Sequence, residues 1–249
     1  MKIDVVFTPS DVKTGSEGGF YVVVDVLRAS SSMVTALGNG SLGIYPVMET
    51  AEALSLADGM EVLACGERNG VRLSGFHLGN SPREFTRQAV AGRKLAMSTT
   101  NGTAAIRAAM AFGRTFVGCF LNAPVISSFL AESGQDITIL CAGREGAFSI
   151  EDTLCAGMIV SRLGEDMTDT ARASSATFEA LQQDIERMLV ESQHGRFLRQ
   201  IGFGEDITFC ARVGSADVIA EVFSTGESPP RDLIIKQVLD PQRLKRGKI

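Results

Sequence analysis

Residues 21–32 read YVVVDVLRASSS and carry the strongest structural signal in the chain. The four apolar residues, three of them β-branched, predict a strand that is buried on both faces, as in a parallel sheet. Asp25 ends this strand, Arg28 follows, and Ser30 or Ser31 is placed to cap the next helix. Ligands of open α/β sheets bind at the carboxyl ends of strands, and helix N-termini attract anions. The segment therefore predicts an anion site, although the same residues would also suit a turn that is merely capped.

The composition limits the classes of function. Of 249 residues, 45% are apolar and 21% are charged, as in ordinary globular proteins. The formal net charge of −5 argues against nucleic acid and against an anionic membrane as partners. Two histidines, His77 and His194, are too few for a three-histidine zinc site. The chain has no secretory pattern, no membrane-length apolar run and an odd number of cysteines, so we expect a cytoplasmic protein with reduced thiols.

Apolar runs alternate with polar loops and helical patterns along most of the chain. Strands are predicted at 3–7, 42–48, 61–65, 94–98, 115–120 and 136–141, and helices at 49–57, 82–89, 104–111, 125–132 and from 149 onward. This alternation predicts an α/β fold, a single domain over residues 1–249 with a mostly parallel or mixed sheet covered by helices. The polar loops that follow the strands are then expected to meet at one edge.

The pattern changes after Arg162. Residues 170–193 form a helical stripe that is expected to pack on the sheet, and a short helix follows at 194–202. Further strands are predicted at 206–211, 218–223 and 233–238, with a Gly-rich loop at 13–19 and a solvated basic tail at 243–248.

Three familiar motifs do not fit. Residues 38–43, GNGSLG, have the glycine spacing of a dinucleotide-binding loop, but they follow a helix and precede a strand, the reverse of the required order. Cys141 lacks the arginine that a cysteine phosphatase needs six residues further on. Asp25 lacks the second aspartate of the aspartyl-nucleophile phosphatases. Cys141 and Cys155 are therefore predicted to be small buried hydrophobes.

Charged and polar residues recur just after the predicted strands. The carboxylates are Asp25, Glu67, Glu145, Glu151 and Asp152, and the arginines are Arg28, Arg68, Arg72, Arg83 and Arg144. Hard carboxylates without a histidine cluster suit Mg²⁺. Arginines beside Gly-rich and Thr-rich turns suit a phosphate-bearing polyanion. Together they predict metal-assisted phosphoryl chemistry.

Each candidate residue receives a predicted role. Catalysis is assigned to Asp25, Glu67 and Asp152, and Mg²⁺ binding to Asp25, Glu67, Glu151 and Asp152. Substrate binding is assigned to Arg28, Ser30, Arg68, Arg72, Asn80, Ser81, Arg83, Thr99, Thr100, Asn101, Gly102, Thr103, Gly143 and Arg144.

Several longer stretches resemble a known family. They are VVVDVLRASSSMVTAL, GERNGVRLSGFHLGNSPREF, STTNGTAAI and CAGREGAFSIEDTLCAG, with a weaker match in GFGEDITFCARVGSADVIAEV. The chain resembles the 2-phosphosulfolactate phosphatases of coenzyme M biosynthesis from about residue 4 to 225. Departures are mild: Ser98, Ser31 and Ser32 stand where the family often has Thr, and Arg144 lies at a variable position.

The resemblance implies Mg²⁺-dependent hydrolysis of 2-phospho-3-sulfolactate to 3-sulfolactate and phosphate, on a fold specific to the family. For this small anionic phosphoester we expect Arg28 to meet the phosphate, and Arg68 and Arg72 to meet the sulfonate and carboxylate. Two alternative functions stay open: a phosphatase for another small phosphorylated acid, and a non-catalytic sensor of an anionic metabolite. A homodimer is the oligomeric state left open.

Overall fold

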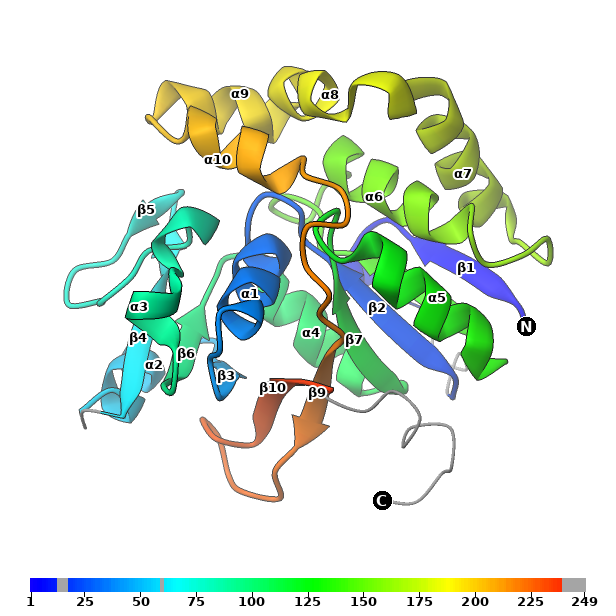
Figure 1. Ribbon diagram of the computed structural model, residues 1–249. Helices are drawn as coiled ribbons and strands as arrows, with labels where there is room; N and C mark the ends of the chain where they lie inside the picture. Colours follow the sequence, from blue (N-terminus) through cyan, green and yellow to red (C-terminus); the bar gives the residue numbers. More distant parts are fainter. Residues whose placement is uncertain (13–17, 59–60, 239–249) are drawn as a thin grey trace.

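The computed structural model describes residues 1–12, 18–58 and 61–238, so most of the predicted Gly-rich loop and the whole basic tail lie outside the described residues. Ten strands form one sheet in the order β1-β8-β2-β7-β9-β10-β3-β6-β4-β5 (Figure 1). The strands are β1 (Ile3–Val6), β2 (Phe20–Val24), β3 (Gly43–Pro46), β4 (Val62–Arg68), β5 (Val71–Arg72), β6 (Lys94–Ser98), β7 (Arg114–Gly118), β8 (Ile137–Cys141), β9 (Ala220–Ser224) and β10 (Leu233–Gln237).

Two parallel blocks make up most of the sheet. Strands β1, β8, β2 and β7 run parallel to one another, and so do β3, β6 and β4. The antiparallel hairpin β9–β10 joins the blocks, because β9 pairs with β7 and β10 pairs with β3. The predicted single α/β domain with a mixed sheet is therefore confirmed.

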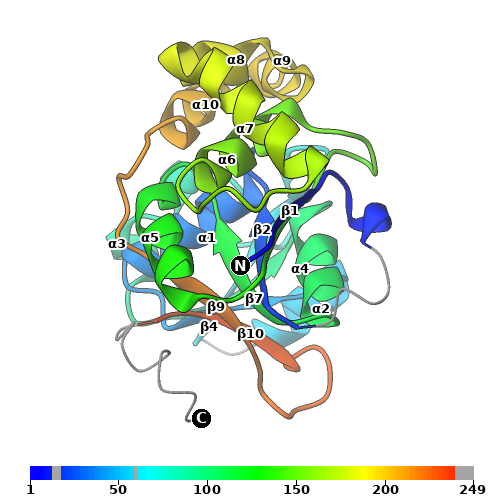
Figure 2. The same cartoon turned by 90° about the vertical axis from the view of Figure 1, so that its right-hand side faces the viewer.

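Helices cover both faces of the sheet. They are α1 (Ala29–Gly38), α2 (Thr50–Leu56), α3 (Arg87–Val90), α4 (Gly102–Met110), α5 (Ala123–Ser133), α6 (Ile150–Val160), α7 (Asp169–Leu181), α8 (Ile185–Glu191), α9 (Gln193–Gln200) and α10 (Gly204–Cys210). Figure 2 shows α4 and α5 on opposite sides of the strands. No helix within the described ranges is long and apolar enough to cross a membrane.

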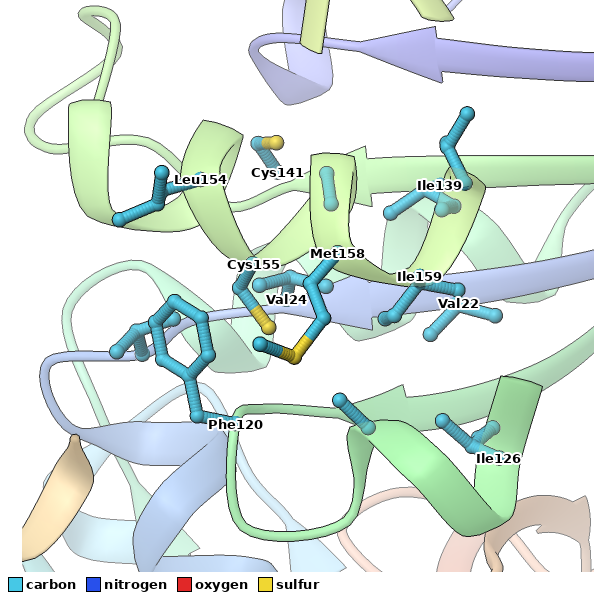
Figure 3. Close-up of a cluster of buried hydrophobic side chains, with 14 of the residues drawn as sticks. Val22, Val24, Phe120, Ile126, Ile139, Cys141, Leu154, Cys155, Met158 and Ile159 are labelled. Carbon is cyan, nitrogen blue, oxygen red and sulfur yellow. The ribbon is translucent and has the colours of Figure 1, made fainter. Parts of the chain in front are cut away.

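Strand β2 is buried on both faces, as predicted. Val22 and Val24 pack with the side chains of α5 and α6, including Met158 and Ile159 (Figure 3). The alternate residues, Tyr21 and Val23, belong to the cluster formed with α4 on the other face. Each such apolar side chain contributes about 1.5–3 kcal/mol on burial, so the strand that ends in Asp25 is held rigidly.

The helices α7 to α10 form a second layer outside α6 and extend over the carboxyl ends of the strands (Figure 1). A Cβ atom on Gly157 of α6 would lie 2.0 Å from the carbonyl oxygen of Ser174 in α7, so only glycine permits this close approach. The stripe predicted at 170–193 thus packs chiefly on a helix rather than directly on the sheet, which corrects the expectation. The second layer supplies one wall of the cleft described below.

Several local predictions were wrong. The segment 82–89 is a 3₁₀ turn (Pro82–Glu84) followed by the short helix α3, whose N-cap, Thr86, accepts a hydrogen bond from the Ala89 N–H. The predicted strand at 206–211 is helix α10. Strand β4 is longer than predicted and turns into β5 through Asn69 and Gly70, both at positive φ (53° and 75°), as an Asn-Gly hairpin requires.

The five cysteines are all buried and free, in agreement with the prediction for Cys141 and Cys155. Burial raises the pKa of each of these thiols above its ordinary value. They are therefore neutral side chains of the core and do not act as nucleophiles.

Candidate active site

A cleft of about 170 Å³ opens where the carboxyl ends of β2, β4, β6 and β8 meet under helix α9. The predicted site residues that line it are Asp25, Arg28, Glu67, Asn80, Thr99, Thr100, Asn101 and Arg144. Six further lining residues were not assigned a role from the sequence: Leu27, Asn69, Gly70, Glu145, His194 and Phe197. The expectation that polar loops after the strands converge at one edge is thus correct.

Asp25 lies at the carboxyl end of β2. Its Oδ1 atom accepts the Ala29 N–H (3.2 Å), and its own N–H donates to the Ser30 hydroxyl (2.9 Å). Ser30 therefore holds the strand end and does not cap α1, whose N-cap position is Arg28 without a side-chain cap bond. Ser31 likewise bonds back to the Val26 carbonyl, so the predicted serine cap was wrong.

The second oxygen of Asp25, Oδ2, accepts no hydrogen bond from any described residue. It faces the start of α4, where a Cβ atom on Gly102 would lie 2.9 Å from it. Burial raises the pKa of Asp25 from 3.8 to about 6, His194 lowers it in part, and Glu67 and Glu151 raise it further. The carboxylate is thus poorly compensated and would be stabilised by a cation.

Glu67 and Asp152 use both of their oxygens to hold the backbone. Glu67 accepts the Gly70 N–H (2.8 Å) on one oxygen and both the N–H and the hydroxyl of Thr100 on the other. Asp152 accepts the Val26 N–H (2.8 Å) and the Gly143 N–H (3.1 Å). These two carboxylates fix the loops of the cleft, and neither presents a free oxygen.

The ligand set predicted for the metal, Asp25, Glu67, Glu151 and Asp152, therefore does not fit. Among the described residues, no group of three or more His, Cys, Asp or Glu side chains is placed to hold a metal ion. Glu151 is nearly inaccessible and faces the His194 ring instead. Of the four carboxylates, Asp25 is the one that lines the cleft with an unused oxygen.

Arg28 lines the cleft, but two of its N–H groups already bind the protein. Its Nη1 donates to Asp206 Oδ2 (2.7 Å) and its Nη2 to the Gly70 carbonyl (2.6 Å), with both charged side chains almost fully buried. The guanidinium also lies 4.4 Å from the centroid of the Phe203 ring. Ser81 completes this network by donating to Asp206 Oδ1 (2.6 Å). Arg28 and Ser81 thus anchor α10 to the strand ends, and the substrate-binding role predicted for them stays a prediction.

Three other predicted arginines lie outside the cleft lining. Arg68 donates to the Glu67 and Met48 carbonyls and to the Ser98 hydroxyl. Arg72 is exposed and donates to the His77 carbonyl, and Arg83 is exposed and forms an ion pair with Glu205. The sequence placed these arginines near the strand ends correctly, but their side chains point to other partners.

The loop from Thr99 to Thr103 reaches the cleft through its backbone. The Thr99 and Thr103 hydroxyls are buried and bond to each other (3.1 Å), which fixes the entry to α4. The N–H of Gly102 has no acceptor among the described residues, so it is available to an anion at this helix N-terminus. Asn80 also lines the cleft, and its buried Oδ1 atom has no hydrogen-bond partner among the described residues.

A histidine and an arginine of the cleft depend on helix α9 for their positions. His194 Nδ1 lies 3.6 Å from Glu151 Oε1, and the Arg144 guanidinium lies 5.0 Å from the centroid of the Phe197 ring. The sequence contains one feature that could have predicted this side of the cleft, the N-cap residue Ser192. Its hydroxyl accepts the Gly195 N–H at the start of α9, the helix on which His194 and Phe197 lie about one turn apart. Glu145 donates its backbone N–H to Asn101 Oδ1, which ties the Arg144 loop to α4.

A buried carboxylate with a free oxygen, beside a helix N-terminus, an arginine and a histidine, suits an enzyme that acts on a small anion. The model of the 2-phosphosulpholactate phosphatase family matches residues 6–224. The chain therefore belongs to this family of phosphoric monoester hydrolases, and the family prediction is confirmed.

Similar proteins come from several bacteria, and each is described as a probable 2-phosphosulfolactate phosphatase. The protein of Pseudothermotoga lettingae is 40% identical over 218 residues, covering 87% of this chain and 94% of its own. That of Thermotoga maritima is 41% identical over 210 residues (84% and 89%), and that of Clostridium perfringens is 34% identical over 237 residues (91% and 95%).

Proposed function

We propose that this protein is a Mg²⁺-dependent phosphatase that hydrolyses 2-phospho-3-sulfolactate to 3-sulfolactate and phosphate. The family match and the names of the relatives support the substrate. The observation that carries the proposal is Asp25, which lines the cleft and whose Oδ2 atom has no donor among the described residues and faces the N-terminus of α4. A buried acid with an unused oxygen costs stability, and binding a charged ligand is the physical reason to retain it.

The lining fits Mg²⁺ in the form that phosphoryl-transfer enzymes use. There the ion takes one or two carboxylates and completes its shell with water and substrate phosphate, so it does not need a cage of side chains. Asp25 would hold the ion through Oδ2. When bound, Mg²⁺ supplies positive charge against the phosphate oxygens.

The charge of the cleft supports the same conclusion. Asp25, Glu67 and Glu145 line it, while the charge of Arg28 is already balanced by Asp206. A phosphate monoester brings about −1.5 to −2 charges, and the carboxylate and sulfonate of the proposed substrate add to them. Arg144 alone does not balance this sum, and a divalent cation would supply the missing positive charge.

In the hydrolysis, water attacks phosphorus, the bond between phosphorus and the C2 oxygen breaks, and the departing oxygen takes up a proton. An alkoxide leaves readily only when it is protonated as it departs. We assign this proton to His194, because its ring lines the cleft and its Nε2 atom has no partner among the described residues, while Nδ1 lies 3.6 Å from Glu151 Oε1. Glu151 itself does not line the cleft.

Phosphate release from 2-phosphosulfolactate tests the proposal. The protein is treated with EDTA, dialysed, and assayed with and without added MgCl₂. Release that requires Mg²⁺ is the expected result. Release that is unchanged after EDTA would reject the metal, and tight binding of the substrate without release would support a sensor instead of an enzyme.

A further inference from the structure

Arg144 differs from Arg28, the other arginine that lines the cleft, in how its charge is used. Arg28 is paired with Asp206 and Arg83 with Glu205. Arg144 has no carboxylate partner among the described residues, although it is half-buried in a cleft that Glu145 also lines. An arginine that lines a cleft and forms no ion pair with the acids near it can bind an anion that enters from solvent.

The backbone around Arg144 is fixed on both sides. The Arg144 N–H donates to the Ala147 carbonyl and the Ala147 N–H to the Arg144 carbonyl, both at 2.9 Å, which closes a tight turn. Before the turn, the Gly143 N–H is bound by Asp152, and within it the Glu145 N–H is bound by Asn101. The position of this cation is therefore set by two neighbouring elements.

The face of the Phe197 ring holds the guanidinium in place. The distance from Arg144 Cζ to the ring centroid is 5.0 Å, within the range of a cation–π contact. Such a contact uses the flat face of the guanidinium and none of its N–H groups, so the bidentate fork stays free for an oxyanion. Because Arg144 and Phe197 both line the cleft, that oxyanion would belong to the bound substrate.

We propose that Arg144, seated on Phe197, selects small phosphoesters that carry a second oxyanion, a carboxylate or a sulfonate. The phosphate itself is left to Asp25 with its cation and to the N-terminus of α4. This inference rests on the proposed function and adds to it the residue that sets substrate choice. Arg144 contacts the non-reacting end of the substrate, so its loss is expected chiefly in KM.

The test compares three phosphoesters: 2-phosphosulfolactate, 2-phospholactate, which lacks the sulfonate, and glycerol 2-phosphate, which lacks both oxyanions. In Arg144→Gln, the ratio of kcat/KM for 2-phosphosulfolactate to that for glycerol 2-phosphate is expected to fall by roughly tenfold to a hundredfold, the value of a charged hydrogen bond. Phe197→Leu is expected to lower the ratio several-fold, because Arg144 loses its support. A loss that persists with 2-phospholactate identifies the carboxylate as the bound group, and a loss confined to 2-phosphosulfolactate identifies the sulfonate.

Arg212 is the matched control, because its guanidinium lies 4.9 Å from the Phe209 ring outside the cleft. Arg212→Gln is expected to leave the ratio unchanged. Equal losses on all three esters in Arg144→Gln, or no loss, would overturn the inference while leaving the phosphatase proposal intact.

A binding measurement separates the two proposals if no ester is hydrolysed. Calorimetry with 3-sulfolactate and with inorganic phosphate is carried out on wild type and Arg144→Gln. A selective loss of 3-sulfolactate affinity supports the role of Arg144 even without turnover. Equal affinities for 3-sulfolactate in the two proteins reject it.

Discussion

Two strand ends face each other across the cleft, that of β2 with Asp25 and that of β4 with Glu67, and they use their carboxylates differently. Both side chains are 7% exposed, so burial does not distinguish them. Glu67 accepts three hydrogen bonds from Gly70 and Thr100, whereas Asp25 accepts one, on Oδ1. A buried acid is therefore structural when both of its oxygens accept hydrogen bonds, and it is available for chemistry when one of them does not.

The largest expected effect of this difference is on catalysis. Asp25→Asn removes the charge at the free oxygen, and its side-chain carbonyl can still accept the Ala29 N–H. We expect kcat/KM for the phosphoester to fall roughly a thousandfold or more, which corresponds to about 4 kcal/mol of transition-state stabilisation. Steady-state kinetics of phosphate release would check this. A kcat/KM within tenfold of the wild-type value would show that Asp25 has no direct role in the reaction.

The next largest effect is on the unfolding free energy and concerns Asp206, whose two carboxylate oxygens both accept hydrogen bonds. Asp206→Ala would leave the Arg28 guanidinium buried without a counter-charge, and breaking such a buried pair costs about 3 kcal/mol or more of unfolding free energy. Urea denaturation measures it. The matched control is Glu205→Gln, which breaks the exposed Arg83–Glu205 pair next to it and is expected to cost less than about 1 kcal/mol. Equal losses in both variants would contradict the anchoring role of Arg28.

The third prediction is that removing the two carboxylates changes the unfolding free energy in opposite directions. Removal of the Asp25 charge stabilises the protein, whereas removal of the Glu67 charge destabilises it. The pKa of Asp25, about 6 when folded and ordinarily 3.8, means that the folded protein retains a proton that the unfolded chain has lost. The unfolding free energy of the metal-free protein therefore falls as the pH rises from about 4 to 6, by at most about 3 kcal/mol. Asp25→Asn should remove this fall and be more stable than wild type at pH 7.

Glu67→Gln provides the opposite case. A glutamine amide cannot accept the Gly70 and Thr100 donors at both ends, so we expect a loss of about 1–3 kcal/mol. Denaturation curves of both variants at pH 5 and pH 7 give the comparison. Destabilisation by Asp25→Asn at pH 7 would mean that its charge is already compensated in the folded protein.

The sequence predicted this region in part. The run Tyr21–Val24 and the Asp25 that follows identified the central strand and its ligand-binding end. A continuous apolar run is a local signal for a buried strand, and the chain direction determines which end is the carboxyl end. The residues 206–211 alternate polar and apolar side chains and were predicted to form a strand, yet they form a helix whose first turn places Asp206 on Arg28. These two residues are 178 positions apart, so no local pattern connects them.

The same limit explains which site residues were missed. The sequence does not distinguish among the candidate carboxylates and arginines near the strand ends. Whether such a side chain already has hydrogen-bond partners depends on residues from other helices and strands. Arg72 and Arg144 illustrate this, because one points away from the cleft and the other stacks on Phe197 inside it. The Asn69–Gly70 turn was open to prediction from its dipeptide alone.

The smallest expected effect, on thermal stability, tests the metal without relying on activity. A ligand that binds only the folded state stabilises it by RT ln(1 + [L]/Kd), about 1.4 kcal/mol when Mg²⁺ is present at ten times its Kd. For a chain of this size that corresponds to roughly 3–6 °C in Tm. We expect this shift in wild type and in Arg144→Gln, whose side chain does not hold the ion. We expect none in Asp25→Asn, because the amide lacks the charge that Mg²⁺ requires. Adding inorganic phosphate should enlarge the wild-type shift, since phosphate oxygens complete the coordination shell. A shift of equal size in Asp25→Asn would place the ion on other residues, and the two strand ends would then no longer differ in the way proposed.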